Sequence, residues 1–318
     1  MTLQQQIRSN RFRSLIAIAG FVLLLLIIAG LIGLVFDVSF GIFALVFAAV
    51  YGIFALVQSR SIVGRLTHAH ELSESDLRPL RRLLENASIG AGLPVTPELR
   101  IVDDPAPNAF AAGLRPKTSY VGVTTGLLRT MPKRELEAVL AHEVAHIRHR
   151  DTYLMTIATI FAGVIALLAD IGFRSLAYGG GRRNQGIVAL VLALVGLALA
   201  PYAALMLRLS LSRRREFLAD AGSAEILNDP EAMALALRRL EHDSTTIRYA
   251  DASTAHLWVE SPTDRVDTTR GSIQALSSLF NTHPPITARI AALEEAGGFR
   301  LPPELPADTP FSLEMGLN

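Results

Sequence analysis

Cysteine is absent from this chain, and charged residues are few. With no cysteine in 318 residues, the chain can form neither a disulfide nor a thiolate–metal bond, so any metal site must use histidine, glutamate or aspartate. Charged residues make up 19% of the sequence, hydrophobic residues make up 50%, and the mean hydropathy is +0.36. This balance is more apolar than that of an ordinary soluble enzyme. The net charge of +1 gives no indication of a nucleic-acid partner.

Two uncharged apolar runs follow a polar N-terminal segment of residues 1–13. They cover residues 14–36 and 38–57, and each is long enough to cross about 30 Å of hydrocarbon as a helix. The first run is longer than the apolar part of a signal peptide, typically about 7–15 residues, and the second follows almost at once. We therefore expect a transmembrane helical hairpin, residues 14–57, rather than a cleaved leader. Arginines flank the hairpin on both outer sides and none lies between the runs, which predicts that its two ends are cytoplasmic.

A second pair of apolar runs lies in the middle of the chain, at residues 152–173 and 187–207. Two interpretations are open: they are membrane spans, or they form a buried helical hairpin in a soluble core. The glycine-rich loop between them carries arginines, against the positive-inside trend, whereas the basic cluster of residues 208–215 favours a cytoplasmic return. The sequence therefore predicts two to four transmembrane helices.

Residues 58–151 have the mixed composition of a soluble domain. A helix is expected over residues 73–84, and short strands are expected near 99–102, 108–113 and 119–123. This order predicts a small β-sheet among helices. An edge strand of such a sheet can pair with an extended peptide through main-chain hydrogen bonds, although an ordinary structural hairpin explains the same residues equally well.

Residues 136–151 read LEAVLAHEVAHIRHRD and contain the pattern His-Glu-x-x-His. His142 and His146 stand four residues apart, so on a helix they share one face, about 5–6 Å apart, and both rings can reach one ion. Glu143 is rotated away from that face, yet it is near enough to act on a water molecule at the ion without becoming a ligand. This is the arrangement of zinc peptidases, with the glutamate as general base. The alternative is a polar helix face with solvated histidines, and we expect His149 to be solvated in either case.

A third ligand is predicted by counting outward from the glycine-rich loop near residue 180. If residues 136–174 and 187–224 form one antiparallel helix pair, Glu216 comes level with the two histidines, with a mismatch of about 3 Å. Asp220 follows one helical turn later on the same face. There it can accept the free ring N–H of a ligating histidine and fix its tautomer. A solvated helix face is the alternative for both acids.

The order and spacing of several segments resemble the HtpX-type membrane zinc metalloproteases. These segments are the His142–His146 motif, Glu216-Phe-Leu-Ala-Asp220, Asn108-Ala-Phe-Ala111, and Thr282-His283-Pro284-Pro285 with Arg289 and Ile290. The resemblance extends over nearly the whole chain. It implies a gluzincin-type endopeptidase of the bacterial cytoplasmic membrane, multi-pass, with its catalytic domain facing the cytoplasm. It also implies a role in stress response and in the quality control of misfolded membrane proteins.

The resemblance assigns a role to each motif residue by position. His142, His146 and Glu216 match the ligands of one Zn²⁺ ion per chain, Glu143 matches the general base, and Asp220 matches the acid behind the ligands. The proposed substrate strand is matched by Asn108, Ala109, Phe110 and Ala111. The implied partners are the lipid bilayer and polypeptide substrates, with no nucleic acid, and the sequence defines no oligomeric state.

The C-terminal part is expected to complete the catalytic domain over residues 208–296. His283 could reach the site as a transition-state donor or as a displaceable fourth ligand, but a packing or turn role before two prolines explains it more simply. The tail, residues 297–318, is rich in proline and has few large apolar residues, so we expect it to be disordered.

Together these features predict an α+β integral membrane protein with a mostly helical, zincin-like catalytic domain and a small β-sheet. The expected activity is the hydrolysis of peptide bonds by a metal-activated water molecule. A catalytically silent membrane scaffold or regulator with a structural zinc site is the main alternative, but structural sites normally have four protein ligands, often cysteines. A second alternative is a transporter, which would need ionisable residues along a path through its spans. Asp170 alone gives this alternative little support.

Overall fold

The computed structural model of the chain describes residues 38–71, 78–157, 159–160, 213–245, 257–259 and 284–314, together with single residues at 12, 19, 23, 26 and 30. The chain divides into two compact units. One consists of Met1–Ile62 and Ile157–Ser210, and the other of Val63–Thr156 and Leu211–Asn318. The His-Glu-x-x-His motif and Glu216 both belong to the second unit, which therefore positions the candidate site.

The first unit contains helix α2, Val38–Val57, which is followed by α3, Ser59–Leu66, at the boundary between the units. Helix α2 covers the residues of the second predicted apolar run. Its exposed large apolar side chains are Val38, Ile42, Phe43, Leu45, Val46, Val50, Ile53, Phe54 and Val57. Among the described residues, no helix combines the length and the apolar character needed to cross a membrane. Most of the expected spans at 14–36, 152–173 and 187–207 lies outside the described residues.

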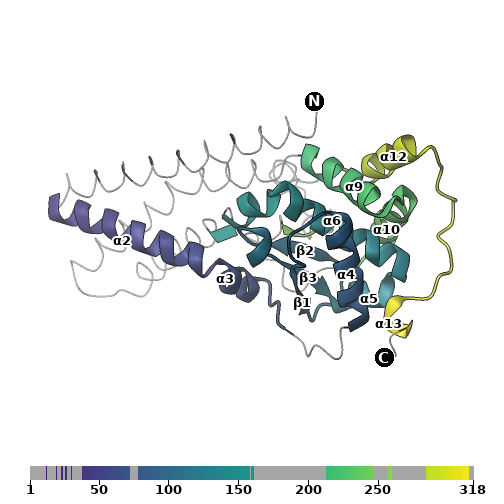
Figure 1. Ribbon diagram of the computed structural model, residues 1–318, viewed down its shortest axis with the longest axis horizontal. Coiled ribbons are helices and arrows are strands. Elements are labelled where there is room, and N and C mark those ends of the chain that lie inside the picture. The colour runs from purple at the N-terminus through teal and green to yellow at the C-terminus, as the bar shows by residue number, and fades with distance from the viewer. Residues whose placement is uncertain are drawn as a thin grey trace, which may run out of the picture. The chain divides into compact units, whose positions relative to one another are not determined.

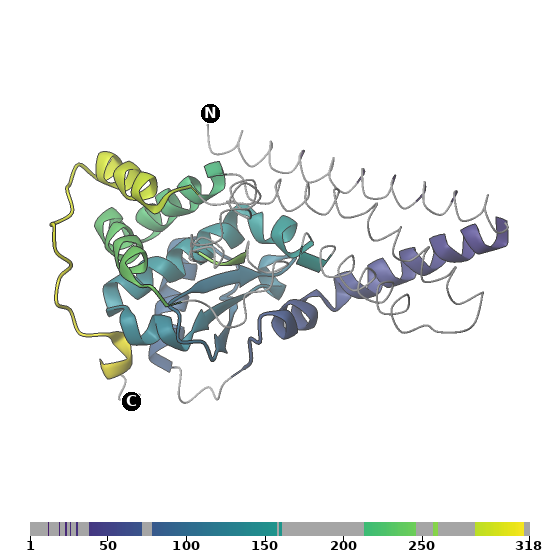
Figure 2. The ribbon, with the colours of Figure 1, turned by 180° about the vertical axis from the view of Figure 1, so that it is seen from behind.

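The second unit contains a sheet of three strands. Strands β1 (Glu98–Val102), β2 (Ala109–Ala112) and β3 (Tyr120–Thr124) lie in the order β1-β3-β2 (Figures 1 and 2). The middle strand β3 pairs in parallel with β1 and antiparallel with β2. The strands lie where the sequence predicts them, because each is a short apolar run bounded by turn residues. Strand β2 is an edge strand of this sheet.

Alternate residues of the strands face two different apolar cores, as the pleat of a strand requires. One face packs against apolar residues of α4 (Arg78–Gly90) and α6 (Lys133–His149), and its strand residues are Ile101, Ala109, Ala111, Val121 and Val123. The opposite face contributes Val102, Phe110, Ala112 and Tyr120 to a second core. Because both faces are covered, β2 and β3 are buried along their whole length.

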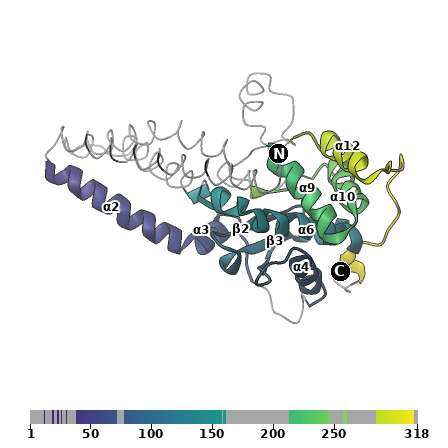
Figure 3. The ribbon, with the colours of Figure 1, turned by 45° about the horizontal axis from the view of Figure 1, so that its top comes forward.

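Helix α6 contacts the sheet and three other helices of the second unit. It packs against β2, β3 and α4, and also against α9 (Arg213–Leu227) and α10 (Pro230–His242). Figure 3 shows α9 lying alongside α6. The approach of these two helices is close, since a Cβ atom on Gly222 of α9 would lie 2.8 Å from the Cβ of Ala145. The small residues at this crossing therefore allow α9 to bring its first turns beside the histidines of α6.

Two segments of the structure differ from the expectations. Helix α4, described from Arg78 to Gly90, continues beyond residue 84, where the predicted helix ends, because Ala87 and Ser88 extend its buried face; the predicted residues 73–77 lie outside the described part of the chain. The tail expected to be disordered from residue 297 is instead placed as far as Glu314. It follows α12 (Ile286–Gly297) and ends in the short helix α13 (Phe311–Glu314). Phe311 is buried, and its N–H donates to the carbonyl of Met131 at 2.9 Å, while Arg239 donates to the carbonyl of Pro306, so contacts with the rest of the unit hold this segment.

Candidate metal centre

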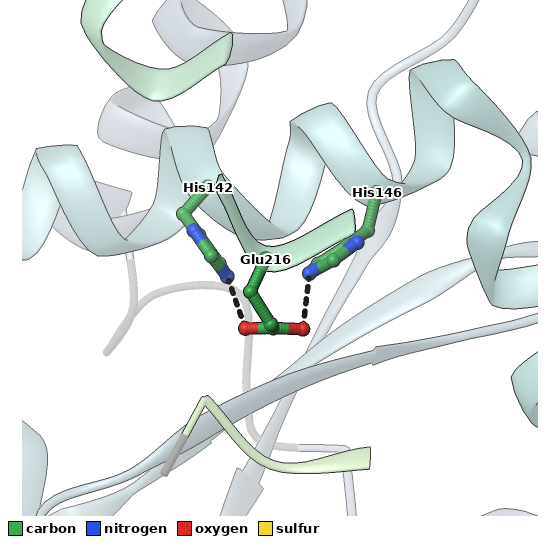
Figure 4. A group of neighbouring side chains, drawn as sticks. All are labelled: His142, His146 and Glu216. Carbon is green, nitrogen blue, oxygen red and sulfur yellow. Dashed lines mark ion pairs between the residues drawn. The ribbon is translucent and has the colours of Figure 1, made fainter. Parts of the chain in front are cut away.

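Helices α6 and α9 bring together the three residues that the sequence predicts as metal ligands. His142 and His146 lie on consecutive turns of α6, with ring centroids 4.8 Å apart. Glu216, in the first turn of α9, extends its carboxylate to both rings (Figure 4). Its Oε2 lies 3.8 Å from His142 Nε2, and its Oε1 lies 3.7 Å from His146 Nε2. All three side chains are buried, so this group of acid and bases is shielded from bulk water.

The three side chains fit a metal ion. One ligand atom from each lies within 4.8 Å of the others. Bonds of about 2.0–2.2 Å to a tetrahedral zinc ion separate its ligand atoms by about 3.4 Å, so small adjustments suffice. His142 Nε2 is buried and forms no hydrogen bond with any described residue, which is unusual for a polar atom unless it binds an ion. Burial also lowers the pKa of the His142 ring and so favours the neutral form that metals require.

A buried ion pair lies behind His142. Asp220 follows Glu216 by one turn of α9, and its Oδ1 lies 3.0 Å from His142 Nδ1. Arg289 of α12 donates hydrogen bonds of 2.8 and 2.6 Å to the two oxygens of Asp220, and its Nη1 lies 3.4 Å from Glu216 Oε2. Asp220 thus orients His142 with Nε2 toward Glu216, where the sequence places a supporting acid. The sequence analysis names Arg289 in one of the segments that carry the resemblance, but it does not predict this ion pair with Asp220.

A second acid, which the sequence analysis missed, lies behind His146. Asp151 Oδ2 is 3.3 Å from His146 Nδ1, and its side chain is 1% exposed. Helix α6 ends at His149, and the left-handed conformation of the following Arg150 (φ 62°) turns the chain so that Asp151 returns toward the helix. Arg215, the neighbour of Glu216, lies 3.7 Å from Asp151 Oδ1. Burial alone would lower the pKa of the His146 ring, but Asp151 and Glu216 outweigh it and raise the pKa to about 9.

We expect Asp151→Asn to weaken metal binding by about 10–100-fold, the usual effect of losing the hydrogen-bond partner of a ligating histidine. The amide keeps the shape of the side chain but removes the charge that fixes the Nδ1 proton of His146. Competition with a zinc-selective dye, measured beside the wild-type chain, checks this. Exposed Asp103 provides the control, because Asp103→Asn should leave zinc affinity unchanged. Equal zinc affinities for all three proteins would show that Asp151 has no such role.

Glu143 follows His142 on α6 but does not belong to the cluster of ligand atoms. Its side chain is 1% exposed, and its carboxylate accepts a hydrogen bond from the Ala111 N–H of β2. Burial raises the pKa of Glu143 to about 8, although His146 and Arg289 act in the opposite direction. A carboxyl group with a pKa near neutrality can both take up and release a proton. The side chain therefore contacts the edge strand, interacts electrostatically with His146 and Glu216, and can carry a proton.

The segment Asn108–Ala111 enters the site as the edge strand β2. Its four residues are buried, each at most 3% exposed. The N–H of Asn108 donates to Thr124 Oγ1 at 2.9 Å, and the N–H of Ala109 donates to Asn108 Oδ1 at 3.0 Å, so side chains fix the start of the strand. Through Ala111, the segment approaches Glu143 directly.

The two other histidines considered in the sequence have different outcomes. His283 lies outside the described residues, so its predicted approach to the site stays a prediction. The expectation that His149 is solvated is wrong: it is only 6% exposed, because α9 covers this end of α6. Its ring lies near Gly222, where a Cβ atom would be 3.6 Å from His149 Cε1. Burial lowers the pKa of the His149 ring.

Comparison with known proteins agrees with this geometry. Residues 74–297 match Peptidase family M48, and this match covers well over half of the chain. The chain therefore belongs to Peptidase family M48 and is a metalloprotease.

Within that class, the chain is similar to proteins named "Protease HtpX homolog". It is 37% identical over 304 residues to the one from Limosilactobacillus fermentum, an alignment that covers 92% of this chain and 99% of the relative. It is 38% identical over 302 residues to the one from Streptococcus uberis, again covering 92% and 99%. The resemblance found in the sequence is thus confirmed. No solved structure shows significant similarity to the chain.

Proposed function

We propose that this chain is a membrane-bound, zinc-dependent endopeptidase that acts in the quality control of misfolded membrane proteins. The observation that carries the proposal is the buried group of His142, His146 and Glu216 with Glu143 beside it, in contact with an edge strand. Three protein ligands leave a fourth position for water or substrate, as in catalytic zinc sites. A structural site would be closed by a fourth protein ligand, and the described residues contribute none.

The residues of the site have different roles in the proposed peptide hydrolysis. His142, His146 and Glu216 would bind Zn²⁺, with Asp220 and Asp151 orienting the two rings. When bound, zinc supplies a Lewis acid that polarises the peptide carbonyl and lowers the pKa of water. Glu143 takes the proton from the attacking water molecule and later delivers it to the leaving amine. The substrate therefore reacts between the ligands and β2, where Glu143 can reach it.

Strand β2 provides main-chain groups that can align an extended polypeptide. In this proposal the segment Asn108–Ala111 pairs with the substrate, so the enzyme recognises backbone and accepts many sequences. An unfolded segment offers such a backbone, whereas a folded domain does not. This property suits an enzyme that removes misfolded proteins.

The membrane part of the proposal is supported by the apolar runs at 14–36 and 38–57 and by the exposed apolar side chains of α2. A helix surface covered by Ile42, Phe43 and Phe54 is unfavourable in water and favourable in lipid. The basic residues on the outer flanks of the two runs support a catalytic domain that faces the cytoplasm. Close to the membrane, the site would meet segments of membrane proteins that have failed to fold.

The full chain, extracted from membranes with detergent, is expected to cleave an unfolded test protein and to lose this activity at least about 100-fold when EDTA removes its metal. Added Zn²⁺ should restore cleavage, and Mg²⁺, which prefers octahedral oxygen ligands, should not. Gel electrophoresis of the test protein and metal analysis of the enzyme measure both quantities. Undiminished cleavage by metal-free protein would contradict the catalytic proposal, and recovery of the chain only in the soluble fraction would contradict the membrane part.

A further inference from the structure

The outer edge of β2 is where a substrate would pair, and its main-chain groups can be assigned. Thr124 N–H of β3 donates to the carbonyl of Asn108 at 3.0 Å. Because bonding directions alternate along an antiparallel strand, Phe110 and Ala112 also direct their main-chain groups toward β3. Ala109 and Ala111 therefore direct theirs away from β3, to the edge that faces Glu143. The N–H of Ala111 already donates to the Glu143 carboxylate, so the carbonyl of Ala109 is the group that an incoming peptide would use.

A short segment of the chain itself already lies on this edge. The N–H of Val259 donates to the carbonyl of Ala109 at 3.0 Å, and Trp258 forms an isolated antiparallel bridge with Phe110. The two aromatic rings contact each other edge to face, with centroids 4.8 Å apart. We call Leu257–Val259 the edge segment. It contacts β2 through this one antiparallel bridge, at the position where an extended peptide would begin to pair.

Val259 of the edge segment forms main-chain hydrogen bonds in two directions, and one of them connects it to the metal centre. The carbonyl of Val259 accepts a hydrogen bond of 3.2 Å from Arg289 Nη1. The same nitrogen lies 3.4 Å from Oε2 of the ligand Glu216. Val259 is thus connected through its N–H to the edge strand and through its C=O to the arginine beside Glu216. A substrate peptide would have to lie in the same place, between the edge strand and the metal ligands.

The edge segment is buried, but one of its buried polar groups has no hydrogen-bond partner among the described residues. Leu257, Trp258 and Val259 are each at most 3% exposed. However, the indole N–H of Trp258 is buried and has no hydrogen-bond partner among the described residues. An unsatisfied buried donor destabilises the folded state, and this cost disappears if the segment moves into water, where the indole N–H can form a hydrogen bond. A permanent interior strand would be expected to satisfy this donor, whereas a segment that leaves its place need not.

We propose that the edge segment blocks the enzyme's own substrate-binding edge, and that substrate must displace Leu257–Val259 from β2 before cleavage. This inference rests on the proposed function, since it assigns a regulatory state to the same site. The physical basis is exclusion: the Ala109 carbonyl directed to the edge cannot accept from Val259 and from a substrate N–H in the same position. The enzyme is therefore inactive until the edge segment leaves β2, and polypeptides that compete poorly for β2 are not cleaved.

A disulfide between the edge segment and β2 tests the proposal in the full chain. Val259 stands opposite Ala109 beside the antiparallel Phe110–Trp258 bridge and donates its N–H to the Ala109 carbonyl. Residues that face each other in this way typically have Cα atoms about 4.5–5.5 Å apart, within the range that a disulfide spans. Ala109→Cys with Val259→Cys introduces the only thiols, because the chain has no cysteine. The oxidised form is expected to cleave an unfolded test protein at least tenfold more slowly than the reduced form of the same protein. Each single variant, treated in the same way, should show the same rate in both redox conditions.

Hydrogen exchange provides a second measurement that does not depend on these substitutions. In Glu143→Gln protein, saturating unfolded polypeptide should abolish the protection of the Val259 amide, because the polypeptide takes its acceptor. Equal cleavage by the oxidised and reduced double variant, or unchanged protection of Val259 in the complex, would make the edge segment a permanent fourth strand and overturn the proposal. Failure of the proposed function has a different signature, namely cleavage that is as fast in Glu143→Gln as in the wild-type chain.

Discussion

Replacing Glu143 with glutamine is expected to lower the rate of peptide hydrolysis by at least about 100-fold, and up to about 10⁴-fold, while leaving the metal content unchanged. The lower figure is the smallest usual contribution of a general base. Glutamine has the same shape but cannot take a proton from water. Metal is retained because Glu143 is not one of the residues whose ligand atoms cluster. The measurement is kcat/KM on an unfolded substrate, with metal analysis of the same preparation.

The control for this experiment is Glu137→Gln, six residues earlier on the same helix. Glu137 is partly exposed and lies outside the ligand cluster, so the same chemical change there should leave hydrolysis within about twofold of wild type. If Glu143→Gln hydrolyses as fast as Glu137→Gln with equal metal in both, Glu143 is not the base. If it loses its metal as well, Glu143 contributes to the ligand set rather than to proton transfer.

The spacing of residues within helices accounts for what could be predicted of the site. His142 and His146 share a helix face at any position in the fold, because i and i+4 are always neighbours on a helix. Glu216 required one assumption, an antiparallel helix pair, and the structure places its carboxylate 3.7–3.8 Å from the two ring nitrogens. Asp220 then follows from the same spacing. The assumed helix over residues 136–174 is wrong in one respect, because α6 ends at His149 and Arg150 is left-handed, and most of the assumed helix pair lies outside the described residues. What helix geometry predicts reliably is the spacing within α6 and within α9.

The parts that could not be predicted depend on turns and tertiary contacts. Asp151 reaches His146 only because Arg150 adopts a left-handed conformation, and an arginine gives no signal of that. The contact of Val259 with Ala109 joins an irregular segment to a strand far away in the sequence, with no period to reveal it. The placement of the C-terminal tail depends on tertiary contacts, among them the burial of Phe311 and the hydrogen bond from Arg239 to the carbonyl of Pro306. In each case the contact joins residues that no periodic pattern in the sequence connects.

Arg289→Met is expected to destabilise the second unit by about 3–5 kcal/mol, the usual result of removing one partner from a buried ion pair. The guanidinium is 1% exposed and donates two hydrogen bonds to Asp220, which is equally buried. Methionine fills much of the volume but leaves the carboxylates of Asp220 and Glu216 close together without a compensating charge. At about 2–4 °C per kcal/mol, we expect the melting temperature of metal-free protein to fall by roughly 10 °C.

The chain contains a matched control for this prediction, because burial rather than distance decides the value of an ion pair. Arg300 and Glu294 approach to 2.6 Å, the same distance as Arg289 and Asp220, but the Arg300 side chain is 79% exposed. Because the Arg300 guanidinium is solvated, its ion pair with Glu294 is screened by water, so Arg300→Met should shift the melting temperature by at most a few degrees. Adding Asp220→Asn to Arg289→Met should recover part of the loss, since it removes one of the uncompensated charges. Equal shifts for Arg289→Met and Arg300→Met would show that Arg289 is not needed to neutralise the acids behind the metal centre.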